Sequence, residues 1–333
     1  MGMGTVILRR LLTLIPMMFL VSIGLFAISL QLNPDKAAHI RAGGAENASL
    51  EIIESIRRDL HLDKPIHERY GRWLFDVVRG DLGESLTRPI PVDSPDGGTE
   101  FRGRSVAIEI KDAVPRTLSI AMVGVVFGLT VGVTVGLIGG LRPGSLLDRF
   151  SVLTTTAGIA MPSFWLIMLL IIAFSVNRDW LPATGYEPLE TGVWNWLSRI
   201  LLPGISVGVA MAAVTARQLR AALMDVMGAA YIRTAWAKGG SSARVVVRHA
   251  LKNAANAPLT VMGNQFAHLL SGTIVIESLV GIRGLGWLVV TSVRSNDITM
   301  IQGLVLFFVV VTVAINLVID LLYSYLNPKV RVG

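Results

Sequence analysis

The chain has 333 residues, of which 52% are hydrophobic and only 16% are charged. Soluble domains carry about 25% charged residues, so this composition excludes a disordered chain, a fibrous protein and a typical soluble enzyme. The net charge of +7 leaves two interpretations open. It is typical of a nucleic-acid-binding surface, or of the basic loops that orient a membrane protein.

Several kinds of reactive site are missing from the sequence. The chain has no cysteine, which excludes disulfides, thiolate metal sites and a cysteine nucleophile. The histidines show no H-E-x-x-H spacing, and the phosphate-binding pattern G-x-x-x-x-G-K-[ST] does not occur. We therefore expect no catalytic residue, cofactor or metal site in this chain. If the protein uses ATP, another subunit must bind it.

Six apolar stretches are long enough to cross a bilayer, which takes about 20 residues at a rise of ~1.5 Å each. The predicted spans cover residues 11–32, 117–141, 150–176, 201–222, 257–280 and 300–326. The first is longer than the apolar part of a signal peptide and lacks a small-residue cleavage site. The fold class predicted is therefore an all-α, polytopic membrane protein with six transmembrane helices.

The spans divide the chain into three predicted parts. Residues 1–32 form an N-terminal cytosolic stub and the first helix, and residues 117–333 form a core of five helices. Between them, residues 33–116 are an extracytoplasmic segment with two amphipathic helices, over 50–61 and from 66 to Gly80. Within it, residues 91–104 are rich in Pro, Gly and Asp, which is typical of a loop. The alternative for this segment is a mere connecting loop.

The charges fit one orientation of these spans. If both termini are cytosolic, thirteen basic residues face the cytosol against two acidic ones, Asp148 and Asp225. The basic residues are Arg9, Arg10, Arg142, Arg149, Arg217, Arg220, Arg233, Lys238, Arg244, Arg248, Lys252, Lys329 and Arg331. Short-loop basic residues orient membrane proteins toward the cytosol, so the orientation is self-consistent.

A stripe of glycines marks the second span. Gly124, Gly128, Gly132 and Gly136 recur at every fourth residue, which places them on one slowly turning helix face. Without Cβ atoms this face allows a neighbouring backbone to approach closely. The stripe predicts helix packing, and lining of a substrate path is the alternative.

The cytosolic segment 223–256 has the pattern helix, glycine break, helix, and three interpretations compete for it. A DNA-binding helix-turn-helix fits in outline, but the segment is tethered between two spans. A solvated basic loop that serves only topology is the second interpretation. A docking surface for a soluble partner is the third, because small residues let a short helix seat in a partner's groove. Spacing does not decide between the last two.

A family resemblance adds to this pattern. Residues 231–239 read YIRTAWAKG and residues 248–253 read RHALKN, which resembles the EAA-type loop of inner-membrane permease subunits of oligopeptide/dipeptide ABC importers. Further matches lie in residues 11–16, 62–65, 79–86, 144–149, 159–165, 180–186 and 326–331. Two places depart from the family pattern: residues 281–286 lack its Trp-Pro, and residues 93–103 are longer than is typical.

The resemblance implies a type I importer (MetI-like) fold and a role in peptide transport across the bacterial cytoplasmic membrane by alternating access. The implied partners are a homologous second permease, two cytosolic ABC ATPase domains that bind ATP and Mg²⁺, an extracytoplasmic solute-binding protein, the lipid bilayer and a peptide substrate. No nucleic-acid partner is expected. The implied ATPase-coupling residues are Ala230, Tyr231, Arg233, Thr234, Ala235, Lys238, Gly239, Arg248 and His249.

A set of polar or kink-forming residues in the spans could line a translocation pathway. They are Pro162, Ser163, Phe164, Asn264, Gln265 and Glu277. A carboxylate in a span is a functional hypothesis by default, yet Glu277 could equally cap a helix, and the two amides could bond between helices. A secondary transporter or channel, or a membrane enzyme, would be the alternative functions. Both lack support, because the sequence shows no clear inverted repeat, mid-membrane carboxylates or nucleophile–base pair.

Overall fold

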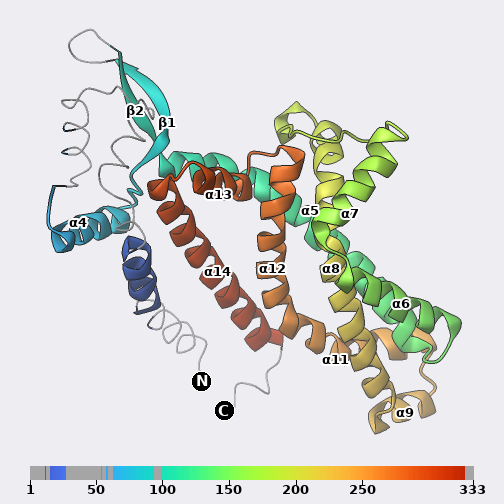
Figure 1. The fold of residues 1–333 in the computed structure, drawn as a ribbon. Coiled ribbons are helices and arrows are strands. Elements are labelled where there is room, and N and C mark those ends of the chain that lie inside the picture. The colour runs from blue at the N-terminus through green and yellow to red at the C-terminus, as the bar shows by residue number, and fades with distance from the viewer. Residues whose placement is uncertain are drawn as a thin grey trace. The chain divides into compact units, whose positions relative to one another are not determined.

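The computed structural model describes residues 16–27, 63–93 and 99–326, together with Leu12, Glu54 and Arg58. Helices dominate (Figure 1), as the predicted fold class requires. The labelled elements are α4 (Ile66–Val78), β1 (Glu84–Asp93), β2 (Thr99–Ser105), α5 (Val106–Leu141), α6 (Leu146–Ala160), α7 (Ser163–Leu170), the π-helix η1 (Ile171–Val176), the 3₁₀-helix η2 (Leu189–Thr191), α8 (Val193–Met227), α9 (Ala230–Ala237), α10 (Ser242–Arg244), the π-helix η3 (Val245–Leu251), α11 (Lys252–Ala254), α12 (Asn256–Val280), α13 (Leu285–Arg294) and α14 (Ile298–Leu326).

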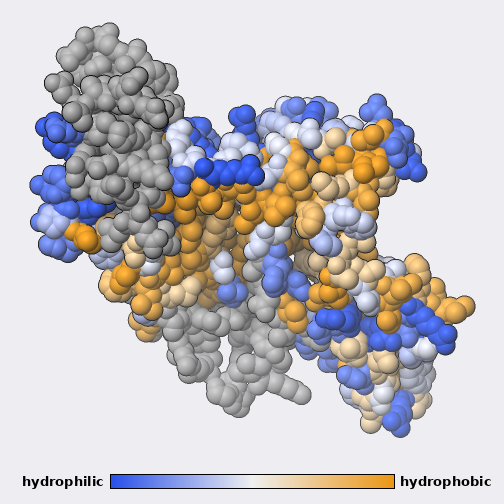
Figure 2. Space-filling model, viewed as in Figure 1, coloured by the Kyte–Doolittle hydropathy of each residue, from blue (hydrophilic) through white to orange (hydrophobic). Residues whose placement is uncertain are grey.

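The apolar helices agree with most of the predicted spans. Among the described residues, α5, α8 and the 298–318 part of α14 are each long and apolar enough to cross a membrane, and two bent helix pairs bring the number up to five. A shorter apolar helix, Pro16–Ala27, lies within the first predicted span, whose other residues are outside the described part. This arrangement is consistent with six spans. Figure 2 shows hydrophobic side chains over the exposed sides of α14 and α7.

The third predicted span is not one continuous helix. α6 and the α7–η1 segment meet at 106°, because Met161 and Pro162 adopt extended ψ angles of 120° and 134°. A residue that precedes proline is driven out of the α region, which ends α6 here. The fifth span is also bent, since residues 268–280 of α12 and α13 meet at 71°.

The chain divides into two compact units, and the first comprises Pro115–Trp287 with the residues from Val318 onward. Its centre is α8, against which α6, α7 and α12 pack. The buried side of α8 includes Leu202, Met211 and Leu219. The glycine stripe of α5 also lies against α8. A Cβ added at Gly132 would be 2.8 Å from the carbonyl oxygen of Ala212, so the two backbones approach closely.

A bulky residue in this stripe should destabilise the unit. Gly132→Leu is expected to lower the free energy of unfolding by about 1–3 kcal/mol or more, because the side chain has no space beside the α8 backbone. The control Thr134→Leu lies on the exposed side of α5 and should unfold like the parent. The measurement is the denaturation midpoint of the purified protein. Equal midpoints for Gly132→Leu and Thr134→Leu would rule out the tight contact.

The second unit comprises residues up to Val114 and Leu288–Leu317. Its helix α4 carries the apolar stripe predicted for the second amphipathic helix, and an aromatic cluster joins it to the 16–27 helix. Tyr70 packs edge-on against Phe26, with ring centroids 5.3 Å apart, and its hydroxyl lies 2.8 Å from Ser22 Oγ. The chain turns at Gly80, where φ is +87°. The first predicted amphipathic helix, over 50–61, lies outside the described residues apart from Glu54 and Arg58.

The expected loop at 91–104 is wrong in part, because most of it belongs to an antiparallel hairpin. Strand β1 pairs with β2 from Glu84 opposite Ser105 to Asp93 opposite Thr99, with an irregularity between Glu84 and Pro89. Pro89 and Pro91 lack a backbone donor, so they are tolerated only because a two-stranded ribbon has free edges. The composition indicated a turn, but pairing between strands is not a local property of the sequence.

Candidate functional site

The predicted coupling segment forms the short helix α9, which follows directly on the long helix α8. α8 ends at Met227, and α9 runs from Ala230 to Ala237. The helix stops at Gly239, whose φ of +78° is in the left-handed region that L side chains disfavour and glycine adopts freely. The glycine of the YIRTAWAKG pattern therefore has a conformational reason: it turns the chain away from the end of α9.

The inner face of α9 is fixed to the surrounding helices. Ile232 is 1% exposed and belongs to a buried cluster with Leu219, Leu223, Val245, Ala250 and Ala254. Ala235 packs against the same cluster. A Cβ at Gly240 would lie 2.9 Å from the carbonyl oxygen of Ala235. The contacts hold α9 against α8 and η3, so these elements form one packed unit.

The outer face of α9 leaves large side chains uncovered. Tyr231 is 46% and Trp236 40% exposed. Ala230, Arg233, Thr234 and Lys238 are exposed as well. Exposed aromatic residues beside basic ones are typical of protein-binding surfaces. The structure also brings the two predicted residues of the following segment close by, on η3, where Arg248 is exposed and His249 is half-buried.

An ion pair that the sequence analysis missed lies beside this segment. The Asp148 carboxylate at the start of α6 accepts two hydrogen bonds from Arg220 of α8, with Nη2 at 2.9 Å from Oδ2, and a third from the backbone of Gly144 at 2.8 Å. Asp148 is 4% exposed and the Arg220 side chain is 26% exposed, so the pair is bidentate and partly buried. It ties α6 to α8 close to Leu223. A charged residue inside the apolar fourth span was the signal that a partner was needed.

The predicted pathway residues come from two parts of the first unit, the start of α7 and helix α12. Pro162, Ser163 and Phe164 form the bend between α6 and α7, with Phe164 46% exposed. Gln265 is half-buried in α12, while the side chain of Asn264 lies outside the described part. Helix α7 packs against α12, and a pathway role for these residues stays a prediction.

Glu277 is fully buried near the end of α12, where it caps the next helix. One carboxylate oxygen accepts a hydrogen bond from Thr117 Oγ1 at 2.7 Å. The other accepts from the backbone N–H groups of Gly286 at 2.8 Å and Trp287 at 3.1 Å, in the first turn of α13. A carboxylate at a helix N-terminus satisfies free donors and the helix dipole. A Cβ at Gly284 would lie 2.5 Å from Glu277 Oε2, which explains the glycine there.

Comparison with known families decides where the chain belongs. The family described as "Binding-protein-dependent transport system inner membrane component" matches residues 128–332, a range that includes α6 to α14. Its N-terminal counterpart matches residues 3–121, which include α4 and the hairpin. The chain belongs to this family. It is a permease subunit of an ABC importer and a multi-pass protein of the inner membrane.

The permease is similar to curated proteins over nearly its whole length. It is 37% identical over 325 residues to the glutathione transport system permease protein GsiC of Escherichia coli O6:H1, covering 98% of each chain. It is 34% identical over 329 residues to a protein of Brucella abortus named for a peptide transport system permease, covering 99% of each. Among solved structures it resembles a chain of the inward-facing methionine ABC transporter MetNI, with a TM-score of 0.54, 19% identity and coverage of 66% of this chain and 97% of that chain. This last similarity supports the predicted MetI-like fold.

Proposed function

We propose that this permease moves small peptides, of the glutathione or oligopeptide class, across the cytoplasmic membrane by alternating access. Its energy comes from two cytosolic ATPase domains that dock on α9. The observation that carries this proposal is that α9 has one buried face and one exposed face. Ile232 is buried in the helix bundle, while Tyr231 and Trp236 on the same short helix are uncovered. A helix anchored on one side and open on the other can pass a partner's movement to the bundle.

The proposed orientation places α9 and both termini in the cytosol. The thirteen basic residues that the topology assigns to the cytosol include Arg233 and Lys238 of the α9 segment. Both are exposed. Acidic residues are scarce there, and the long segment 33–116 is then extracytoplasmic. The charge that first allowed a nucleic-acid interpretation is thus assigned to orientation and docking.

The proposed assembly supplies what this chain lacks. ATP and Mg²⁺ are bound by the ATPase subunits, and no cofactor is assigned to this chain. A homologous second permease completes the membrane part, and an extracytoplasmic solute-binding protein delivers the peptide to the outer mouth. The names of the relatives in Escherichia coli and Brucella abortus support a peptide-like substrate. The bundle then alternates between two states that the ATPases bias.

The test is transport by the purified assembly. The tagged permease is isolated from its own membranes and reconstituted in vesicles with the subunits that co-purify. We expect two kinds of partner to co-purify with the tagged permease, namely ATPases and a second permease. We also expect uptake of labelled glutathione or a short peptide that requires ATP and the binding protein. Uptake driven by an ion gradient without ATP would contradict the proposal and support a secondary transporter.

A further inference from the structure

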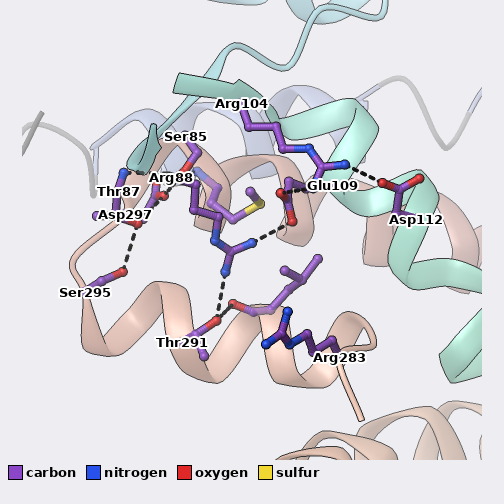
Figure 3. A network of polar contacts seen from close by, with 12 residues as sticks. Ser85, Thr87, Arg88, Arg104, Glu109, Asp112, Arg283, Thr291, Ser295 and Asp297 are labelled. Atoms are coloured by element: carbon purple, nitrogen blue, oxygen red, sulfur yellow. Dashed lines mark hydrogen bonds and ion pairs between the residues drawn. The ribbon is translucent and has the colours of Figure 1, made fainter. Parts of the chain in front are cut away.

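A polar cluster away from α9 is centred on Asp297, in the turn between α13 and α14. Its side chain is fully buried. One carboxylate oxygen accepts from the backbone N–H of Met300 at 3.1 Å, which caps α14, and from the N–H of Leu86 at 3.1 Å. The other accepts from the hydroxyls of Ser85 and of Thr87. One carboxylate therefore joins the start of α14 to the base of strand β1 (Figure 3).

A second set of bonds ties the same hairpin to α13 and α5. The guanidinium of Arg88 donates to Glu109 Oε2 at 2.9 Å and to Thr291 Oγ1 at 2.9 Å. Arg104, on strand β2, donates to the other oxygen of Glu109 at 2.8 Å and to Asp112 at 2.6 Å. Glu109 thus lies between two arginines that come from the two strands (Figure 3). The hairpin is bonded to the first turns of α5 as well as to α13.

The covalent path from the hairpin to α5 is as short as it can be. Strand β2 ends at Ser105, and α5 begins at the next residue, Val106. Around the base of the hairpin the packing is close. A Cβ at Gly83 would lie 2.9 Å from Thr299 Cγ2, in the first turn of α14. The hairpin base is therefore joined directly to the first turn of α5 and is in close contact with the first turn of α14.

The hairpin itself needs support from elsewhere. A two-stranded ribbon is at best marginally stable in water, and the bonds of Asp297 and Arg88 hold it at its base. These hydrogen bonds are directional, so they fix the orientation of the hairpin more closely than non-directional apolar contacts would. A charge-assisted network of this kind makes the contact between the hairpin base and the helices rigid.

We propose that Asp297 is a positioning residue that passes contact of the binding protein with the hairpin strands, residues 84–93 and 99–105, to helices α5 and α14. This inference rests on the proposed function, because it assigns the hairpin to the extracytoplasmic side where the binding protein docks. The hairpin and Asp297 then pass a partner's movement to the helices on the outer side, as α9 is proposed to do on the cytosolic side. Docking of the binding protein then shifts α5 and α14 through the bonds of Asp297, and ATP hydrolysis by the ATPases rises.

The test measures ATP hydrolysis of the reconstituted assembly as the binding protein is titrated. Asp297→Asn keeps an oxygen for the N–H groups of Met300 and Leu86, and asparagine caps helices well, but it replaces the oxygen that binds the two hydroxyls. We expect unchanged assembly, basal hydrolysis and half-saturating concentration of binding protein. The maximal stimulation should fall at least about fivefold. Thr87→Val, which removes one hydroxyl at nearly constant shape, should show a smaller loss of the same kind.

The control is Asp112→Asn, since Asp112 is 46% exposed and pairs only at the rim of the network. It should behave like the parent. Wild-type stimulation in Asp297→Asn, or basal and stimulated hydrolysis that fall in parallel, would overturn the inference. So would a higher half-saturating concentration of binding protein with unchanged maximal stimulation, which is the mark of a docking residue.

If Asp297→Asn does not assemble, Thr87→Val is judged by the same criteria. A parent assembly without any stimulation would contradict the proposed function itself, and the two failures are therefore distinguishable.

Discussion

Transport is expected to be abolished when Ala235 is replaced by aspartate, while the ATPase activity of the free ATPase subunits stays intact. Ala235 packs beside Ile232 against the buried cluster under α9, and an unpaired carboxylate is costly to bury. The helix should then tilt or detach from α8, and a partner's movement would no longer reach the bundle. The measurement is ATP-dependent peptide uptake in vesicles, compared with hydrolysis by the isolated ATPases.

Two matched controls sharpen this result. Ala237→Asp places the same charge on the exposed side of α9 and should keep transport. At the end of the helix, Gly239→Val should also abolish transport, because a β-branched residue at φ +78° is strained by roughly 1–2 kcal/mol or more. Gly239→Asn should be tolerated, since asparagine adopts this conformation. Transport by Ala235→Asp at the level of Ala237→Asp would disprove the coupling role.

The second large effect is expected at Glu277, where two substitutions separate a helix cap from a pathway charge. Glu277→Ala leaves the N–H groups of Gly286 and Trp287 and the hydroxyl of Thr117 without their buried acceptor. Leaving a buried donor unsatisfied costs about 1–3 kcal/mol, so for these three donors we expect a loss of roughly 3–9 kcal/mol and little assembled permease. Glu277→Gln keeps a carbonyl oxygen for the α13 N–H groups and should remain close to the parent in stability and transport.

The measurement for this pair is the denaturation midpoint together with peptide uptake. Glu190→Ala, an exposed carboxylate in η2, serves as the control and should change neither. If Glu277→Gln assembles with parental stability and yet fails to transport, the charge itself is needed. The pathway interpretation of Glu277 would then replace the capping interpretation.

Periodic and local features of this permease could be predicted from its sequence. Helices α5, α12 and α14 overlap closely with predicted spans, because about 20 apolar residues in a row have few other structures in a bilayer. The α9 segment was recognisable for a local reason as well. Small residues and a glycine at a fixed position indicate a short helix that stops abruptly, and Gly239 does adopt the left-handed conformation.

The features that were missed depend on residues far apart in the chain. Asp297 and Ser85 are 212 positions apart, and nothing near Asp297 distinguishes it from a solvated loop acid. The pairing of β1 with β2 was hidden in the same way, since its prolines and glycines also suit a loop. Asp148 and Arg220 were each counted as loop charges, although Arg220 in an apolar span could have indicated a buried partner.

Cross-linking from α9 tests the central claim most directly, and the absence of native cysteine makes it clean. A single Thr234→Cys on the exposed side of α9 is labelled with benzophenone maleimide, which needs no thiol on the partner, and photolysed in the native assembly, with Trp194→Cys, 64% exposed at the start of α8, as the comparison. We predict a cross-link from position 234 to an ATPase subunit and none from position 194. No ATPase adduct at position 234, or equal adducts at both positions, would contradict docking of the ATPases on α9.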